Sequence, residues 1–252
     1  MFMPDERERL RVQLVAAARE DGRITGAAHL GSAAIGQQDA WSDIDLALCL
    51  APEASFEDVL RDWTARLYGD LGAVAHLDVR RREILYRVFL LGNTLQIDVS
   101  FWPAEEFRAV GPKFKLIFGT ANETRTAPEP EAKDLADMGW LYALHVRSAI
   151  ARRRWLQAEY MLSGMRNEML ALACRRHGLV AVQGRGLDEL PRDFQTRVAR
   201  CFLQSLEEAE LRRAFAETTE ALLEEIGYAD PEMADRVQGP LREIADVSGS
   251  RS

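Results

Sequence analysis

The sequence predicts an α+β fold in which a small mixed-sheet domain precedes an all-α helical bundle. Two observations indicate this division. Residues 24 to 102 hold several short apolar runs around one amphipathic segment, a pattern typical of a mixed sheet with helices packed on it. Beyond a Thr/Pro/Glu-rich stretch, residues from 134 onward show only the apolar spacing of amphipathic helices. The predicted domains are residues 1–125 and 126–252.

The totals of the chain fit a globular protein with one large domain or two modest ones. Its 252 residues are 47% hydrophobic and 29% charged. A formal net charge of −8 argues against non-specific binding of nucleic acid, so no nucleic-acid partner is expected. Three scattered cysteines, a charged start and the lack of any long apolar run predict a cytoplasmic protein with no membrane partner. We expect a monomer or a homodimer.

The first domain is expected to alternate helices and strands and to close near Pro103. Leu10, Leu14 and Ala18 lie at helical spacing and predict an opening helix. Ser55, with Asp58 three residues later, marks a capped start of the second helix. The expected elements are a helix over 5–20, a strand over 23–30, a helical turn or two within 33–38, a strand over 43–50, a helix over 55–71, and strands over 73–79, 84–91 and 94–102.

The second domain is expected to be entirely helical. Residues 107–134 are interpreted as a transition that ends in an exposed connection. Gly178 follows a long amphipathic run and predicts a C-cap. The expected elements are helices over 134–154 and 155–178, a loop over 184–191, three helical segments from about 191 to 246, and a frayed end over 247–252.

Two carboxylates, Asp43 and Asp45, flank one isoleucine at the start of an apolar strand. Side chains alternate between the faces of a strand, so both aspartates should protrude from the same face. Two anionic groups held this close are unfavourable unless a cation neutralises them. The pair therefore indicates a metal site.

A Gly31-Ser32 pair lies at the end of the preceding strand. A strand that turns into a helix at such a pair offers backbone N–H groups and a hydroxyl to a phosphate. The short connection from Ser32 to Asp43 leaves room for a helical turn and a return to a neighbouring strand. This layout predicts a phosphate site beside the carboxylate pair.

A third carboxylate should come from another strand, and two residues compete for this place. Asp98 is acidic within an otherwise apolar strand, where an unpaired charge is costly. Asp78 has a similar setting, but the arginines at 80–82 offer it a surface ion pair, so it ranks second. With Asp98, the three carboxylates are the minimum set for two-metal phosphoryl or nucleotidyl transfer.

These residues carry a resemblance to a known family. The GS at 31–32, the SDID at 42–45 and the aspartate in QIDVS at 96–100 resemble the three-part signature of the DNA polymerase β-type nucleotidyltransferase superfamily. The chain length and the trailing helical domain are similar to its small bacterial members that modify lincosamide and aminoglycoside antibiotics. The helical half is similar in layout only.

The resemblance implies the roles of the site residues. Asp43 and Asp45 would ligate Mg²⁺, as two ions, and Asp98 would complete the metal site or act as general base. Gly31, Ser32 and Ser42 would hold the triphosphate of ATP or another NTP. AMP would then move from ATP to a hydroxyl of a small acceptor, which the acidic chain favours as a cation, for example an aminoglycoside or a lincosamide. In such an enzyme the acceptor would lie between the two domains.

Four alternatives stay open. Some relatives use a glutamate of the helical domain as the base, which makes Glu159 a reserve candidate. Glu159, Ser163 and Arg166 form a stripe that lines the cleft or is merely a polar helix face, the second being favoured. The acceptor could instead be a protein or an RNA. The chain could also be a non-catalytic nucleotide-binding antitoxin or regulatory module, although all three carboxylates are present.

Overall fold

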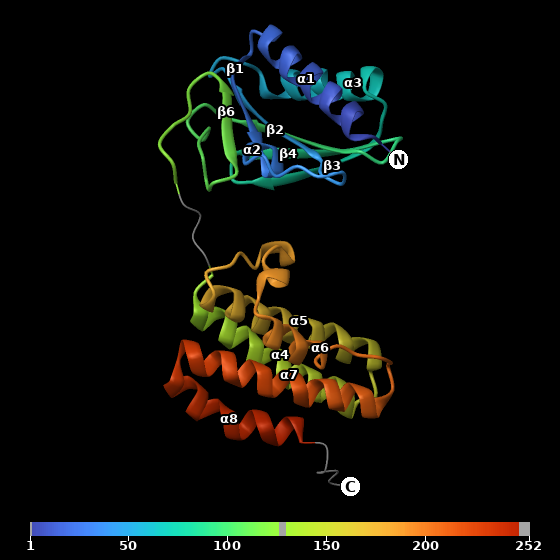
Figure 1. Cartoon of the computed structure of the whole chain (residues 1–252), viewed down its shortest axis with the longest axis vertical. Coiled ribbons are helices and arrows are strands. Elements are labelled where there is room, and N and C mark those ends of the chain that lie inside the picture. The colour runs from blue at the N-terminus through green and yellow to red at the C-terminus, as the bar shows by residue number, and fades with distance from the viewer. Residues whose placement is uncertain (1, 126–129, 247–252) are drawn as a thin grey trace. The chain divides into compact units, whose positions relative to one another are not determined.

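The computed structural model describes residues 2–125 and 130–246, which form two compact units. Contacts divide the chain into Met1–Pro128 and Glu129–Ser252. The first unit is a six-stranded mixed sheet with helices packed on it, and the second is built from helices (Figure 1). The predicted fold class is therefore confirmed. The predicted boundary after residue 125 adjoins residues 126–129, which lie outside the described ranges.

The elements of the first unit follow the predicted pattern closely. Pro4 opens the first helix, a position where its missing N–H costs no hydrogen bond. Ser55 caps the helix that follows it, because its Oγ accepts a hydrogen bond of 3.4 Å from the N–H of Asp58. The elements are α1 (Pro4–Glu20), β1 (Ile24–Leu30), α2 (Gly31–Ala34), β2 (Ile44–Leu50), α3 (Phe56–Asp70), β3 (Ala73–Arg81), β4 (Ile84–Leu91), β5 (Gln96–Trp102) and β6 (Phe114–Phe118).

The sheet has the strand order β3-β4-β5-β2-β1-β6. β2 and β5 pair in parallel, and the other neighbouring pairs are antiparallel. The parallel pair is central, and its two strands are far apart in sequence. This pairing decides which side chains meet at the candidate site.

The main core of the first unit lies between the sheet and two helices. Alternation sends Ile44, Leu46, Ile97 and Val99 to one face of β2 and β5, where they are buried. α1 and α3 cover this face with Leu14, Ala18, Val59, Trp63 and Leu67 (Figure 1). The other face of the same strands carries Asp45 and Asp98 near their starts and the buried Ala47, Cys49 and Trp102 farther along.

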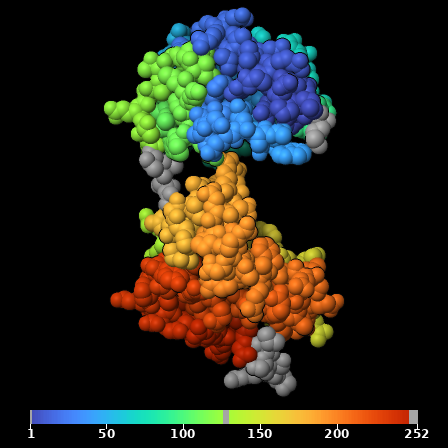
Figure 2. All heavy atoms as spheres, viewed as in Figure 1, coloured from blue at the N-terminus to red at the C-terminus, as the bar shows by residue number. Residues whose placement is uncertain are grey.

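The prediction that the sheet domain closes near Pro103 is wrong. β6 lies within the stretch interpreted as a transition, and it pairs antiparallel with β1 from Ala27 to Leu30. Residues of this segment also cover part of the second sheet face, where Phe107 and Trp102 are buried. In the space-filling view the green atoms of this segment lie against the blue atoms of the N-terminal region (Figure 2). The sequence assigns the segment to the transition because the run is only five residues long, and its pairing with β1 is what places it in the sheet.

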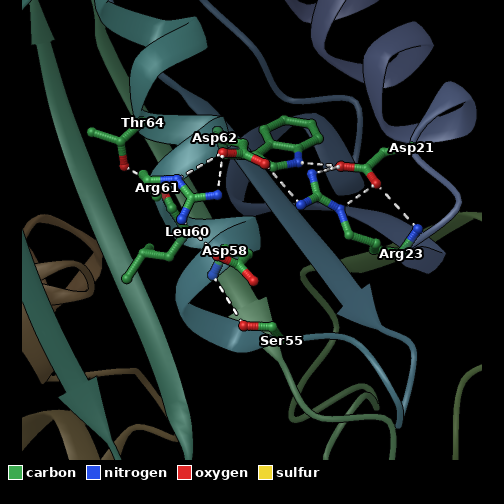
Figure 3. A network of polar contacts seen from close by, with 9 residues as sticks. Asp21, Arg23, Ser55, Asp58, Leu60, Arg61, Asp62 and Thr64 are labelled. Atoms are coloured by element: carbon green, nitrogen blue, oxygen red, sulfur yellow. Dashed lines mark hydrogen bonds and ion pairs between the residues drawn. The ribbon is translucent and has the colours of Figure 1, made fainter.

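A polar network fixes α3 to the end of α1 and the start of β1 (Figure 3). Arg23 donates to Asp21 at 2.9 Å and to Asp62 of α3 at 2.8 Å. The indole N–H of Trp63 donates to Asp21 at 3.1 Å. The hydrogen bonds from Arg23 hold the pKa of Asp21 below its usual value. The network therefore ties together the helical layer that supports the sheet.

The second unit has its own core among long helices. Leu162 and Met165 pack with residues of neighbouring helices such as Ala143 and Leu222, all fully buried. Gly178 has φ +66°, as its predicted capping position requires. No helix in the described ranges is long and apolar enough to cross a membrane. The elements are α4 (Ala132–Ala151), α5 (Trp155–Arg176), α6 (Arg192–Ala199), α7 (Glu208–Ala229) and α8 (Pro231–Ala245).

Two further features complete the second unit. The predicted loop over 184–191 holds parts of two short 3₁₀ turns, Val182–Gly184 and Leu187–Glu189. Glu225 of α7 is buried and receives two hydrogen bonds from Arg176 of α5, at 2.9 and 2.7 Å. This pair neutralises a buried carboxylate that would otherwise be costly. The frayed end expected over 247–252 lies outside the described residues.

Candidate functional site

Asp43, Asp45 and Asp98 come together on one face of the sheet. Asp45 of β2 and Asp98 of β5 are direct partners in the parallel pairing, and Asp43 immediately precedes β2. Each residue offers a carboxylate oxygen, and these oxygens lie within 4.8 Å of one another. The structure thus brings together the three carboxylates that the sequence singled out.

The alternation of β2 and β5 explains why these side chains share a face. Ile44 and Leu46 flank Asp45, and Ile97 and Val99 flank Asp98. All four flanking residues are buried against the helices. The aspartates must therefore point to the opposite face. A shift of register by one residue would bury them in the core instead.

Gln96 links two of the carboxylates and was not singled out from the sequence. Its Nε2 donates to Asp98 Oδ1 at 2.9 Å and to Asp43 Oδ2 at 3.4 Å. Its position two residues before Asp98 on the same strand face is the signal that could have found it. A neutral amide orients both carboxylates without neutralising their charge.

The pKa of Asp98 is raised to about 6, mainly by burial and to a smaller extent by the nearby charge of Asp43, while the hydrogen bond from Gln96 opposes the shift. A carboxylate is harder to ionise when it loses water and faces another anion. Divalent cations such as Mg²⁺ prefer oxygen ligands and supply the missing positive charge. The donor set and the crowding of charge therefore fit a divalent metal ion.

Gly31 packs directly against the carboxylate of Asp45. Its φ is +57°, a backbone conformation that favours glycine. A Cβ atom at this position would lie 2.0 Å from Asp45 Oδ2, which is far inside van der Waals contact. Glycine is therefore required at position 31 for two reasons: the positive φ of the turn and the contact with the Asp45 carboxylate. Ser32 follows in the single turn of α2, adjacent to this contact.

Ser42 belongs to a braced loop in front of Asp43. Its hydroxyl donates to Asp39 Oδ1 at 2.8 Å and accepts from the N–H of Asp39 at 2.9 Å. Arg7 of α1 is buried and donates to the carbonyl oxygens of Asp39, at 2.6 Å, and Ser42, at 3.0 Å. Arg7 was also missed from the sequence, where nothing separates it from the neighbouring charged residues of the helix.

Asp78 lies apart from the three carboxylates. It pairs in register with Arg87, which pairs with Val99, so it belongs to the helix-covered face of the sheet. Arg87 binds it through two hydrogen bonds of 2.6 Å each, and these lower the pKa of Asp78. The partner is thus this cross-strand arginine, whereas the sequence had favoured the arginines at 80–82.

Glu159, Ser163 and Arg166 form a connected set on α5. Ser163 Oγ donates to Glu159 Oε1 at 2.7 Å, and Arg166 Nη2 donates to Ser163 Oγ at 2.8 Å. Arg166 is buried and donates to the carbonyl of Cys201 at 3.1 Å. Arg166 is therefore packed inside the helical unit, and a role of the stripe in acceptor binding stays a prediction. Within the described part of the chain, buried Glu159 Oε2 accepts no hydrogen bond.

Comparisons with known proteins found similarity to solved structures. No protein-family model and no curated protein matches the chain. The crystal structure of an aminoglycoside 6-adenyltransferase from Bacillus subtilis is similar over 95% of this chain and 98% of that chain, with 15% sequence identity and a TM-score of 0.38. A function for this chain must therefore be argued from its own residues.

Proposed function

We propose that this protein is a Mg²⁺-dependent nucleotidyltransferase that moves AMP from ATP to a hydroxyl of a small molecule. The observation that carries the proposal is the meeting of Asp43, Asp45 and Asp98 within 4.8 Å, on the sheet face opposite the core. Three carboxylates held this close have no structural benefit without a cation, because they repel one another. At the same site Gly31 lies against Asp45, where a larger residue would displace the carboxylate.

Asp43 and Asp45 would hold Mg²⁺, and Asp98 would complete the set or remain free to take a proton. Mg²⁺ bound there would supply positive charge to the phosphate oxygens as negative charge develops on them. Gly31 and Ser32 would offer backbone N–H groups and a hydroxyl to the triphosphate. Ser42 would do the same only after its hydroxyl turned away from Asp39.

The reaction would be an in-line displacement at the α-phosphorus of ATP. The acceptor oxygen forms a bond to phosphorus, the bond to the bridging oxygen breaks, and pyrophosphate leaves. The acceptor proton would pass to Asp98, the carboxylate that lies beside the proposed metal ligands Asp43 and Asp45. The products are the AMP ester of the acceptor and pyrophosphate.

Glu159 remains the reserve for the base. Its Oε2 is buried and accepts no hydrogen bond from the described residues, so a donor from a ligand would satisfy it. Its Oε1 is already engaged by Ser163 and Arg166, which favours a fixed orientation over a mobile one. Asp98 is preferred because it adjoins the two aspartates that would hold the metal.

The acceptor proposed is a small hydroxylated molecule, with aminoglycosides and lincosamides as the first candidates. Support comes from the net charge of −8 and from the carboxylates of the site, which attract amines. The three cysteines are unpaired thiols, which suits a reducing compartment such as the cytoplasm. A protein or an RNA could accept AMP by the same chemistry, and the labelling experiment below distinguishes these acceptors from a small molecule.

The test is incubation of the protein with labelled ATP, Mg²⁺ and a panel of aminoglycosides, lincosamides, proteins and tRNA. Mass analysis should detect an added AMP on a small molecule, and chelation of the metal should abolish the product. ATP binding without transfer to any acceptor would favour the non-catalytic alternative. Labelling of protein or tRNA alone would overturn the small-molecule acceptor.

A further inference from the structure

The sheet face that carries the carboxylates continues past Asp98 across β4 and β3. Residues paired across neighbouring strands share a face, and Asp98 pairs with Val88, which in turn pairs with Leu77. The same alternation places every second residue of β3 and β4 on this face. Its larger apolar members that are not buried, which we name the apolar strip, are Leu77, Val79, Tyr86, Val88 and Leu90.

Much of the apolar strip is open to solvent. Leu77 is 55% exposed, Leu90 48% and Val79 40%. On the other face of β4, Leu85 and Phe89 are fully buried by the helical layer. Apolar surface of this extent, bordered by polar groups, is typical of a ligand or partner site.

The apolar strip is continuous with the candidate active site at one border and ends in packed structure at the other. Leu90 pairs with Gln96, the residue that bonds Asp98 and Asp43. At the other end, Tyr86 packs edge-on against buried Trp102, with ring centroids 6.2 Å apart. A ligand on the strip would therefore extend toward the carboxylates.

Within β3 and β4, one charged residue lies on the carboxylate face, and the others lie on the helix-covered face. On the carboxylate face these strands carry Arg81, whose guanidinium lies 5.9 Å from the ring centre of Tyr86. The acidic residue of β3, Asp78, is on the other face and bound to Arg87. Amines lying along the strip would thus find apolar contacts and an arginine, and no carboxylate of these two strands.

We propose that the apolar strip binds a nonpolar part of the acceptor, so that the substrate is an amphiphilic hydroxylated molecule. This inference rests on the proposed function, because it places the reacting hydroxyl at Asp98. Strands lie about 4.7–4.9 Å apart, so an alkyl chain or ring next to that hydroxyl would meet Val88 first and Leu77 next. A polar polycation would leave this surface exposed and would meet the charge of Arg81.

The experiment measures binding, independently of turnover, with alkyl β-D-glucopyranosides as probes. Methyl, butyl, hexyl and octyl glucosides are titrated into the whole protein by calorimetry, below micelle-forming concentrations. We expect affinity to rise with chain length, by up to about fourfold for each buried methylene. In the Leu77→Ser/Leu90→Ser variant this dependence should flatten. The Val12→Ser variant is the control, because Val12 is 59% exposed on α1, over the other face.

Each outcome decides the inference. Affinity that is independent of chain length, or equally dependent on it in the Leu77→Ser/Leu90→Ser variant, overturns the apolar strip as a binding surface. Analytical ultracentrifugation measures self-association of the parent and of the Leu77→Ser/Leu90→Ser variant. If the parent self-associates and the variant does not, a second copy of the chain covers the apolar strip, and the inference is overturned. Mg²⁺–ATP binding is measured in parallel and tests the proposed function separately. If the protein does not bind Mg²⁺–ATP but its affinity for glucosides still rises with chain length, only the proposed function is overturned.

Discussion

At the scale of single residues, the site holds three carboxylates close together, where burial and mutual repulsion make their negative charge unfavourable. Asp45 and Asp98 are partners across two central strands, and Asp43 lies close enough for its charge to raise the pKa of Asp98. The hydrogen bonds of Gln96 position these groups without removing the repulsion between them. The metal-free protein should therefore be more stable, and inactive, when one of these charges is removed.

Asp43→Asn and Asp45→Asn should each abolish AMP transfer and leave the fold intact. Either change removes an anionic ligand, so metal affinity falls, while the repulsion among the remaining carboxylates also falls. Transfer is measured by mass analysis, and stability by thermal unfolding in a chelator, where the melting temperature should be unchanged or slightly higher. Retention of more than a few per cent of activity in either variant would remove that residue from the metal site.

Asp98→Asn should lower transfer as severely, whereas Asp78→Asn should leave it nearly intact. Asp78 is bound to Arg87 on the other sheet face, so its loss weakens an ion pair and costs about 1 kcal/mol of stability. Initial rates and urea unfolding of both variants check this contrast. The reverse order of activities would mean that the third carboxylate is Asp78.

The stability of the metal-free protein should carry a pH dependence that comes from Asp98. Its folded-state pKa of about 6 lies above the ordinary value of 3.8, so the protonated form is the one that folding favours. This contribution is fully present below about pH 4 and is lost as pH rises through 6. Urea unfolding of the parent and of Asp98→Asn across pH 4 to 7 isolates the effect, because other groups titrate alike in both. Addition of Mg²⁺ at pH 7 should restore stability to the parent only, and a constant difference between the two proteins would contradict the assignment.

At the scale of elements, the turn from β1 into α2 and the loop before β2 bring backbone close to the carboxylates. Gly31 begins α2 and touches Asp45, while the buried Arg7 of α1 donates to two carbonyl oxygens of the loop. An irregular loop beside a charged site stays in place only when its polar groups are satisfied. α1 therefore supports the site as well as the core.

Gly31→Ala should impair metal binding and transfer much more than Gly36→Ala. Both glycines have positive φ, +57° and +68°, so both substitutions carry a backbone strain of about 1–2 kcal/mol. Only at Gly31 would the added Cβ also displace a carboxylate, because Gly36 has no neighbour within 4 Å. Mg²⁺ titrations followed by thermal shift, together with transfer rates, separate the two effects. Equal loss of metal binding in both variants would show that the contact with Asp45 is unimportant.

At the scale of the whole molecule, the two units have separate cores. Among the described residues, the buried side chains of the sheet unit form two clusters, and those of the helical unit form another. All three carboxylates, Gln96 and Gly31 belong to the first unit, whereas Glu159 belongs to the second. Metal binding should therefore be a property of the sheet unit alone.

A fragment of residues 1–125 should fold and keep the Mg²⁺ response of the full chain. It contains every strand of the sheet and both helices that cover the core, so no buried cluster is cut. Circular dichroism melting should show one cooperative transition, and Mg²⁺ should raise its midpoint as in the intact protein. The Asp45→Asn form of the fragment is the control and should not respond. An unfolded or aggregated fragment would show that the sheet unit depends on the helical unit.

Much of this protein follows from its sequence alone, because the decisive patterns are local. Apolar alternation and helical spacing predicted the fold class and nearly every element, and Ser55 and Gly178 occupy the capping positions expected of them. The two-residue spacing of Asp43 and Asp45 places them on one face in any strand. Each of these patterns involves residues that are close together in the sequence, within two turns of a helix or two positions of a strand. They can therefore be recognised without the structure.

Tertiary structure decided what depends on strands and helices that are distant in sequence. The parallel pairing of β2 with β5 sets Asp98 beside Asp45 and leaves Asp78 to Arg87 on the other face. β6 is only five residues long, and it joins the sheet through its pairing with β1. The open apolar strip and the support from Arg7 are equally invisible in the sequence. The physical reason is that register and burial are set by the packing of the whole core, and a one-residue shift would exchange the two faces of a strand.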